Sequence, residues 1–491
     1  MTRLRRSRSL AALGAAAVLT GCTVGPDFHG PPPQAPAARF GAEPADTPSR
    51  TTGGAIDEAW WSSFGDPELS SLVERLARQN LDLKAAAERI VQARAARRIA
   101  RAEGLPQVSG QAKYTRERES ANGFASLEVP APGAPLEFDL DDTSLQASWE
   151  LDLFGRVRRA VEAADAGVQA QVQARRDLAL TAVADLAQTY LQLRSIQARE
   201  AVVQRNLAAA DVRRRLTRDR LRNGVATLSD IAQADAQAAA IGEDLPSLHQ
   251  QDSQLINALG VLLALPPRAL EAELRPPPGQ PPAAQPGQPP RVPVGLPSEL
   301  LRRRPDIRQA EANLHAATAE TGVAVADFYP DVTLTGSYGN ESLSTNHLFD
   351  YASRMFMAGP TVSLPIFQGG QLRGQLQLRR AQQREAALAY RRTVLQAWRE
   401  VDDALTAYSD TQHRYGEIQH VRDEDRTALR VAEQRYVQGV ENFIDVTAAQ
   451  AAVFRDEDQL AQAQADISAA LVRLYRALGG GWRSVEAVAP A

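Results

Sequence analysis

Lysine is almost absent from this chain of 491 residues, because all but two of its 55 basic residues are arginine. Neither Lys84 nor Lys113 follows a glycine, so the sequence contains no phosphate-binding loop of the G-x-x-x-x-G-K type. A single cysteine excludes disulfides within the chain and every metal site that needs several cysteines. The six histidines are scattered, with no H-E-x-x-H motif. These absences argue against an enzyme.

Aromatic residues are also scarce, at 5% of the chain, whereas Ala, Arg and Gln are abundant in its middle. This composition favours long helices over large globular cores. After the N-terminal segment, no stretch offers eighteen unbroken apolar residues, and we therefore expect no membrane-spanning helix.

The N-terminal segment has the features of a secretory signal. Four arginines among the first eight residues precede an apolar run from Leu10 to Leu19. The only cysteine follows in the tetrapeptide L-T-G-C, which resembles a bacterial lipobox. We therefore expect residues 1–21 to be removed and Cys22 to carry a covalent lipid. An ordinary signal peptide with a chance cysteine is the alternative.

The residue after the lipobox and the net charge bear on the destination of the mature chain. Thr23 replaces the Asp that is typical of lipoproteins held at the inner membrane, which favours delivery to the outer membrane. Removing the signal leaves 51 basic and 59 acidic residues, a net charge of −8. This charge argues against nucleic acid as a partner.

The two halves of the chain resemble each other. At a shift of 224, Leu76–Tyr114 matches Leu300–Tyr338 at seven positions of the first segment: Leu76, Arg78, Asp82, Ala86, Pro106, Val108 and Tyr114. At a shift of 215, Arg220, Gly224, Val225 and Asp230 match Arg435, Gly439, Val440 and Asp445. Because the matches occur in the same order, we interpret the chain as two copies of one unit.

This repeat predicts the organisation of the whole chain. The expected parts are a signal peptide (1–21), an extended N-terminal segment (22–65), the first repeat (66–264), a Pro-rich linker (265–298), the second repeat (299–479) and a C-terminal tail (480–491). Within each repeat, the pattern predicts a helix, two strands, a long helix and a shorter helix.

The long helices are expected over Val157–Asn223 and Leu372–Gln438, because neither segment contains proline. At about 1.5 Å per residue, each would span roughly 100 Å. Shorter helices near 227–264 and 299–327 have nearly the same summed length, so two of them stacked end to end could pair with one long helix. A filamentous coiled coil without strands is the alternative.

Strict alternation of apolar and polar residues predicts four strands. It is clearest over Ser144–Leu153 and recurs in 107–114, 331–338 and 361–366. A soluble sandwich would give the same pattern. Four strands cannot close a barrel alone, and open edges are not tolerated in lipid, so several copies would share one barrel. Three copies give twelve strands, and the polar loops Arg116–Asp142 and Asn340–Met355 suit the cell surface.

Several short motifs, in their order, resemble a known family. They are C-T-V-G-P-D-F from Cys22, W-W-S-S-F-G-D-P-E-L from Trp60, L-F-G at 153–155 and L-P-I-F-Q-G-G at 364–370. Together they resemble the outer membrane factors, the TolC-like exit ducts of tripartite efflux pumps, and in particular the NodT-type lipoprotein branch. The resemblance extends from Cys22 to about Leu478.

The resemblance implies an α+β membrane protein. Long antiparallel helical hairpins would form a periplasmic tunnel, and four strands per chain would contribute to a twelve-stranded outer-membrane β-barrel in a homotrimer. A mixed α/β belt, built partly from the linker and the termini, would surround the tunnel. The implied partners are a periplasmic adaptor and an inner-membrane pump.

The implied function is an exit channel for small toxic compounds or drugs, with no cofactor besides the lipid on Cys22. An outer-membrane conduit for type I protein or peptide secretion is the alternative within the same architecture. A periplasmic adaptor is the alternative from another class, but adaptors normally have one hairpin, whereas this chain has two and two amphipathic strand pairs.

Two glycines are expected to form the turns of the hairpins. Gly224 and Gly439 each end a long helix at the end farthest from the strands, where a left-handed cap suits glycine. Asp230 and Asp445 follow six residues later. Around a threefold axis, such an acid would repeat as a ring of carboxylates that attracts cations and disfavours anions.

The family resemblance also assigns a closing role to residues near these turns. An acid near the first turn and a tyrosine just before the second help hold the tip closed in the family, and Asp230 and Tyr436 occupy those places. Glu441 stands where some relatives have a basic residue, so the closing network is expected to differ, with Arg435 as a candidate member.

A second departure from the family concerns the number of acidic rings. Many relatives have an acid one turn after the position of Asp445, where this chain has Ala448. The constriction is therefore expected to hold one ring, formed by Asp445, rather than two. A solvated acid in a hairpin is the alternative for Asp445.

Overall fold

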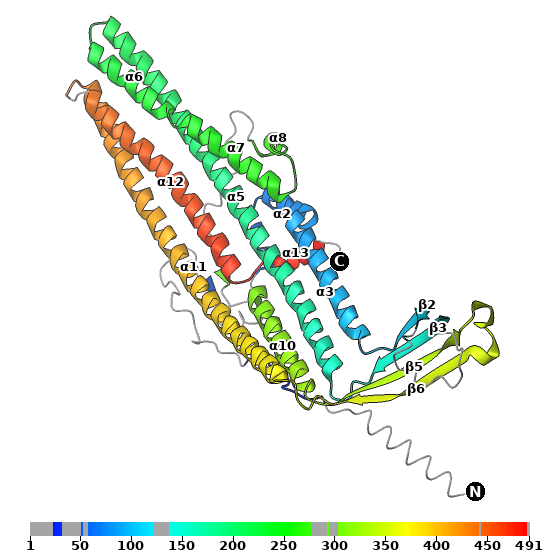
Figure 1. Cartoon of the computed structure of the whole chain (residues 1–491). Helices are drawn as coiled ribbons and strands as arrows, with labels where there is room; N and C mark the ends of the chain where they lie inside the picture. Colours follow the sequence, from blue (N-terminus) through cyan, green and yellow to red (C-terminus); the bar gives the residue numbers. More distant parts are fainter. Residues whose placement is uncertain are drawn as a thin grey trace. The chain divides into compact units, whose positions relative to one another are not determined.

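Two helices of 67 residues each are the longest elements of the chain (Figure 1). The computed structural model describes residues 23–31, 51–52, 57–118, 120, 137–275, 292–293, 303–440 and 443–488. The predicted signal peptide, Cys22, most of the Pro-rich linker and Glu441 lie outside these ranges.

The chain divides into two units, and each draws on both halves of the sequence. The first unit comprises Met1–Gly30, Ile90–Ala170 and Ala310–Tyr390. The second unit comprises Pro31–Arg89, Gln171–Gln309 and Arg391–Ala491. A duplicated chain folds in this way when equivalent segments of its two copies associate with each other.

The first unit contains a four-stranded antiparallel sheet, whose strands are β2 (Gln107–Arg118), β3 (Glu137–Glu150), β5 (Asp331–Ser342) and β6 (Arg354–Ser363). Their order in the sheet is β2-β3-β5-β6, so β2 and β6 are its edges (Figure 1). Leu145 of β3 pairs with Tyr338, and Tyr338 pairs with Phe356. The predicted alternation is therefore correct: it places apolar side chains on one face across the strands.

This apolar face is uncovered within the chain. The exposed fractions are 68% for Val108, 58% for Leu145, 56% for Tyr338 and 83% for Phe356. A soluble sandwich would bury such a face against a second sheet. The exposure therefore indicates that the sheet faces lipid on this side.

The strand boundaries differ from the prediction. Strand β3 begins at Glu137 and ends at Glu150, so Leu153 lies beyond the strand. The Asp152 carboxylate accepts hydrogen bonds from the backbone N–H groups of Val157 and Arg158, at 3.2 and 2.9 Å, and so caps the following helix. The strands also extend into the predicted loops, to Arg118 and Ser342.

The bounds of the elements repeat along the chain. Helices α3 (Leu81–Ala102) and α10 (Pro305–Ala326) have 22 residues each and begin 224 residues apart, as do β2 and β5. Helices α5 (Arg156–Arg222) and α11 (Gln371–Val437) begin 215 residues apart. The shift falls because the first copy is nine residues longer between its first strand and its long helix.

The remaining elements belong to the second unit. They are β1 (Thr51–Thr52), η1 (Trp60–Phe64), α2 (Pro67–Gln79), α6 (Leu228–Gly242), α7 (Leu245–Leu262), α8 (Glu271–Leu274), β4 (Val292–Pro293), α12 (Phe443–Ala477) and α13 (Trp482–Val488). Strands β1 and β4 pair in parallel, so the chain has strands beyond the four predicted. The short turns η2 (Thr345–His347) and η3 (Tyr351–Ser353) belong to the first unit.

Two predicted helices are each broken into two. At Asn80, between α2 and α3, the side-chain amide donates to the Leu262 carbonyl at 2.8 Å. Its oxygen accepts from the Leu83 N–H at 3.0 Å, which starts the second helix. The predicted helix over 227–264 is divided between α6 and α7, and Pro246 stands in the first turn of α7, where proline is tolerated.

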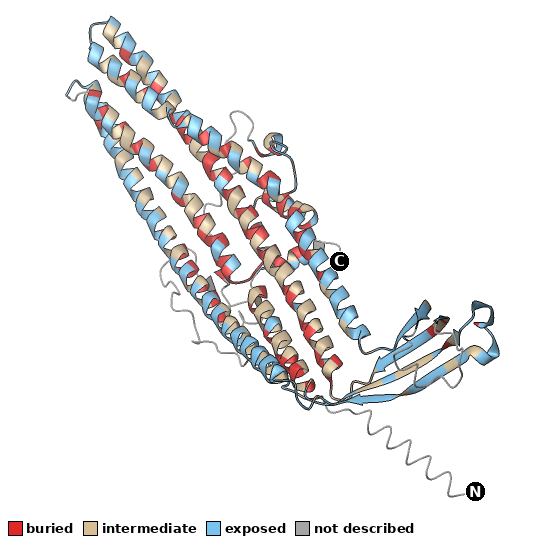
Figure 2. Cartoon of the chain, in the orientation of Figure 1, coloured by how far each residue is buried: buried red, intermediate tan, exposed pale blue. Residues whose placement is uncertain are grey.

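Buried side chains recur along α5 and α12, while much of α11 is exposed (Figure 2). In the second unit, Trp60 stacks on Tyr475 with the ring centroids 5.2 Å apart. Its Nε1 donates to the Gly480 carbonyl at 3.3 Å. A Cβ at Gly481 would lie 2.8 Å from that nitrogen, so the glycine makes room for the indole. Across the described ranges, no helix is both long and apolar enough to cross a membrane.

Candidate functional site

Both predicted glycine turns end their helices with the same hydrogen-bonded cap. Gly224 has φ of +72° and Gly439 has φ of +77°. The Val225 N–H donates to the Arg220 carbonyl at 2.9 Å, and the Val440 N–H donates to the Arg435 carbonyl at 3.0 Å. This six-to-one bond and the left-handed glycine define a Schellman cap. The repeat therefore extends to the hydrogen bonding of the turns.

Asp230 lies in the first turn of α6, where its carboxylate is engaged locally. Its Oδ2 accepts from the Thr227 N–H at 2.7 Å, while the Asp230 N–H donates to the Thr227 hydroxyl at 3.2 Å. This reciprocal pair is a capping box. The acid thus stabilises the start of the returning helix, a role that the sequence analysis did not assign to it.

Tyr436 connects the two hairpin turns. The Arg220 guanidinium of α5 lies over its ring at 4.5 Å from the centroid. Phe443 of α12 lies against the same ring, with the centroids 5.5 Å apart. A cation over an aromatic face is attracted by the ring quadrupole. Arg220, which the sequence analysis did not select, is therefore the arginine at this tyrosine, and Arg435 is an exposed residue one position before it.

Asp445 lies in the first turn of α12 and is exposed. A carboxylate at this position interacts favourably with the partial positive charge of the helix N-terminus. Ala448 follows in the same helix without a charge. Within the described part of this helix start, the carboxylate thus faces solvent beside the second turn.

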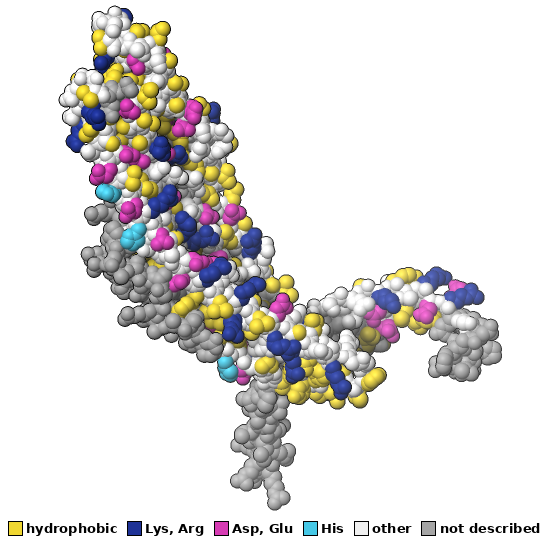
Figure 3. All heavy atoms as spheres, turned by 90° about the vertical axis from the view of Figure 1, so that its left-hand side faces the viewer, with side chains coloured by type: hydrophobic (Ala, Val, Ile, Leu, Met, Phe, Trp, Pro, Cys, Tyr) yellow, Lys and Arg dark blue, Asp and Glu magenta, His cyan; other side chains and the backbone are white. Residues whose placement is uncertain are grey.

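Ion pairs join the two hairpins in the second unit. Arg213 of α5 contacts Glu433 of α11 at 2.6 Å, and Arg199 of α5 contacts Asp458 of α12 at 2.7 Å. Basic and acidic side chains are interspersed on the helical face seen in Figure 3. The abundance of arginine was visible in the sequence, but the partners are more than 200 residues away, so the pairing could not be predicted.

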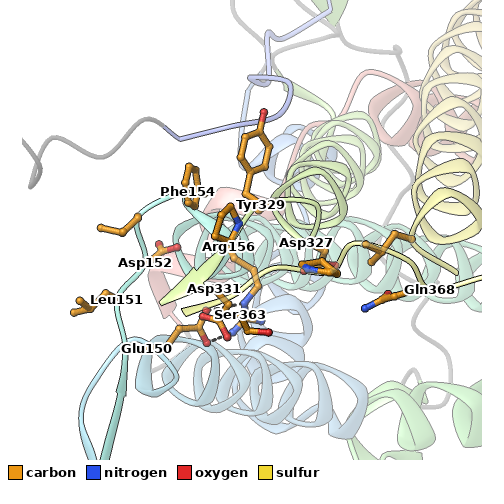
Figure 4. Close-up of a pocket in the computed structure, with 15 residues that line it drawn as sticks. Glu150, Leu151, Asp152, Phe154, Arg156, Asp327, Tyr329, Asp331, Ser363 and Gln368 are labelled. Atoms are coloured by element: carbon orange, nitrogen blue, oxygen red, sulfur yellow. Dashed lines mark hydrogen bonds and ion pairs between the residues drawn. The ribbon is translucent and has the colours of Figure 1, made fainter. Parts of the chain in front are cut away.

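A polar cavity of about 400 Å³ lies in the first unit, where the strands give way to helices (Figure 4). Arg156 crosses it and binds the Glu150 carboxylate twice, at 2.6 and 2.9 Å. Phe154 and Tyr329 stack at its side, with the centroids 4.8 Å apart. Burial raises the pKa of Asp327 on the same wall, although the nearby Arg156 opposes this. The contacts fix the directions in which α5 leaves β3 and β5 leaves α10.

The cavity and the turns differ in what they can do. Among the described residues, no group of three or more His, Cys, Asp or Glu side chains could hold a metal ion. The turns combine an exposed acid, an aromatic residue and an arginine at the end of two hairpins. Such a set can hold helices together and select ions, which are the requirements of a gated pore.

The fold and these turns define the class of the protein. The family model described as outer membrane efflux protein matches residues 72–264 and 296–480. Outer membrane protein OprJ of Pseudomonas aeruginosa is 34% identical over 473 residues, which cover 96% of each chain. Nodulation protein T of Rhizobium leguminosarum bv. viciae is 30% identical over 473 residues, covering 96% of this chain and 93% of its own.

A solved structure agrees. The outer-membrane channel OprN superposes with a TM-score of 0.84 and 32% sequence identity, over 94% of this chain and 100% of the other. The chain belongs to the outer membrane efflux protein family. It is an outer membrane exit channel of tripartite efflux and not an enzyme. Its helical hairpins form the tunnel and its four-stranded sheet contributes to the β-barrel.

Proposed function

We propose that three copies of this chain form the exit duct through which a pump expels small toxic compounds or drugs. The observation that carries the proposal is the sheet with two open edges and an uncovered apolar face. Strand β2 begins, and β6 ends, on the side where the helices attach. An edge β6 laid beside β2 of the next copy is thus antiparallel, like the other pairs in the sheet.

Exposed apolar residues on the helices of the first unit support the assembly. Ile99 of α3 and Leu388 of α11 are each 67% exposed, and Leu378 is 50% exposed. Helices that leave apolar residues uncovered in one chain bury them against a neighbour. A homotrimer closes twelve strands and covers these positions together.

The hairpin turns are the proposed closed end of the duct. In the homotrimer, Arg220 and Tyr436 hold the first and second hairpin of each copy together, and Asp445 contributes one carboxylate to a ring. Asp230 supports the same end by capping α6. Opening then requires separation of the two hairpins, which a periplasmic adaptor and an inner-membrane pump would drive from below.

The lipid on Cys22 is the proposed anchor of the mature chain. It rests on the lipobox and on the motif that follows, since Cys22 itself is outside the described residues. Palmitate labelling tests it: the full chain should be labelled and Cys22→Ser should not. Equal labelling of both forms would contradict acylation at Cys22.

The proposed substrate class is tested in cells that lack this chain. Deletion should raise the accumulation of a panel of fluorescent drugs, and a plasmid carrying the wild-type chain should restore export. A plasmid carrying the chain without residues 107–118, which removes strand β2, should not. Unchanged drug accumulation with loss of a secreted protein from the medium would instead favour type I secretion.

A further inference from the structure

The segment that directly follows Cys22 lies against the first unit in an extended conformation. We call residues 23–28 the N-terminal strap. The Val24 N–H donates to the Phe154 carbonyl at 3.1 Å, and the Arg159 Nε donates to the Val24 carbonyl at 3.3 Å. The strap is therefore hydrogen-bonded on its backbone to the β3–α5 connection and to the first turn of α5.

Arg159 is the centre of the charged contacts with the strap. Its side chain is only 5% exposed. One nitrogen contacts the Asp27 carboxylate at 2.6 Å, and another contacts Glu162 at 2.7 Å. The Arg159 guanidinium holds the pKa of the Asp27 carboxyl below its usual range. A buried arginine needs such partners, because an unpaired buried charge is costly.

A second contact fixes the end of the strap on α10. The ring of Phe28 stacks on His315 with the centroids 4.3 Å apart and the planes 11° from parallel. His315 Nε2 contacts the Glu162 carboxylate at 2.9 Å. The aromatic and the charged contacts therefore share Glu162, so the strap binds α5 and α10 through one connected set of side chains.

Three glycines make the room in which the strap lies. Gly25 has φ of +92°, and a Cβ there would lie 2.6 Å from the Gly322 Cα of α10. A Cβ on Gly322 would lie 2.9 Å from the Arg159 Cδ, and one on Gly155 would lie 2.8 Å from Thr23. None of these distances is possible for a real Cβ, so the backbone contact depends on glycine on both sides.

We propose that this groove is a recognition site for the acidic strap, and that it ties the lipid-bearing N-terminus to the point where strands become helices. A chance contact would not combine a buried arginine, a ring stack and three glycines on six residues. Because Thr23 abuts Gly155, the residue before it is held next to the helix-side end of β3. The strap site thus sets where the acyl chains enter the bilayer relative to the sheet.

The coupling to lipid rests on the proposed acylation of Cys22, whereas occupation of the groove does not. A spin label at His29→Cys in the full chain reports on the strap, because His29 is exposed and follows it directly. If Cys22 is acylated, mass spectrometry should find one label per chain. Two labels would show a free Cys22 and would overturn the acylation while leaving the strap site to be judged from the label's mobility.

The label should be immobile in the unmodified strap site and become at least threefold more mobile in Arg159→Gln. Arg97→Gln is the matched control, because Arg97 pairs with Asp165 of α5 but does not contact the strap. If Arg159→Gln fails to fold, Asp27→Asn combined with Phe28→Ala changes only the strap side of the contacts. A label that is equally immobile in this double variant, or already mobile in the unmodified strap site, would overturn the proposal.

Gly322→Ala provides an independent measurement. Alanine normally favours a helix over glycine, so a purely local effect would stabilise α10. The strap site predicts a released label instead, because the new methyl group displaces Arg159 and the backbone of Gly25. Gly374→Ala in α11, where no atom of the chain lies within 4 Å of the added Cβ, should leave the label unchanged. An immobile label in Gly322→Ala would contradict the proposal.

Discussion

Carboxyl groups at a few positions carry the pH response of the second unit. Glu68 of α2 and Glu273 of α8 lie together, with Arg75 bound to Glu273 at 2.5 Å. Burial first, and then a hydrogen bond with the Glu273 carboxyl, raise the pKa of Glu68 to about 7, although Arg194 opposes this. A hydrogen bond between two carboxyl groups requires one proton, so the pair holds together only while that proton is bound.

The sign of the pH dependence follows from this pair. The folded-state pKa of Glu68 lies above its ordinary value of 4.5, so its contribution to stability is full below about pH 4.5 and is lost as the pH rises through 7. Thermal unfolding should therefore occur at lower temperature at pH 8 than at pH 5.5. Glu68→Gln should remove most of this difference, because an amide donates to Glu273 at either pH. Glu74→Gln, at an exposed residue of the same helix, should retain it.

Asp445 tests the proposed ring of charge. Carboxylates that converge around a threefold axis repel one another and should attract cations. Asp445→Asn keeps the volume and removes the charge, so it should weaken cation selectivity and block by multivalent cations in planar bilayers. Asp410→Asn, at an acid elsewhere on α11, should change neither property. Unchanged selectivity in Asp445→Asn would mean that Asp445 does not line the constriction.

At the scale of elements, helix period and repeat were readable from the sequence, and the breaks were not. The proline-free segments predicted the two long helices to within one residue at each end. The break at Asn80 depends on a hydrogen bond to Leu262, which lies 182 residues away. No local pattern carries that information, whereas the left-handed caps at Gly224 and Gly439 follow from glycine alone.

The sites show the same division. The sequence placed Tyr436 and Asp445 beside the second turn because both are near Gly439 along the chain. Arg220 was not selected, since its contact with Tyr436 forms only when separate hairpins meet. The strap was recognised as a motif, but Arg159, which binds it, is 132 residues from Asp27.

The Schellman cap at the second turn gives a prediction about stability. Gly439→Ala forces an L side chain into the left-handed region and should destabilise the hairpin by about 1 kcal/mol. Gly416→Ala, in the interior of α11, should stabilise it by a similar amount, because glycine is a poor helix former. Hydrogen exchange of the amides around residue 440 measures the difference. Equal protection in both variants would contradict the importance of the cap.

At the scale of the molecule, one chain is an incomplete barrel. Its sheet has two unpaired edges and an apolar face that no part of the described chain covers. Unpaired backbone groups are not tolerated in lipid, so the folded monomer should not persist in detergent. Native mass spectrometry should give three chains per particle. A stable, folded monomer would contradict the shared barrel.

The account as a whole claims that this chain is a channel held shut where its hairpins end. Single-channel recording in planar bilayers tests that claim most directly. The wild-type protein should give small conductance steps, and Arg220→Gln combined with Tyr436→Ala should give severalfold larger steps, because both groups that join the hairpins are gone. Arg94→Gln, at an exposed arginine of α3, should conduct like the wild type. Equal conductance in the double variant and the wild type, or no conductance from either, would contradict the account.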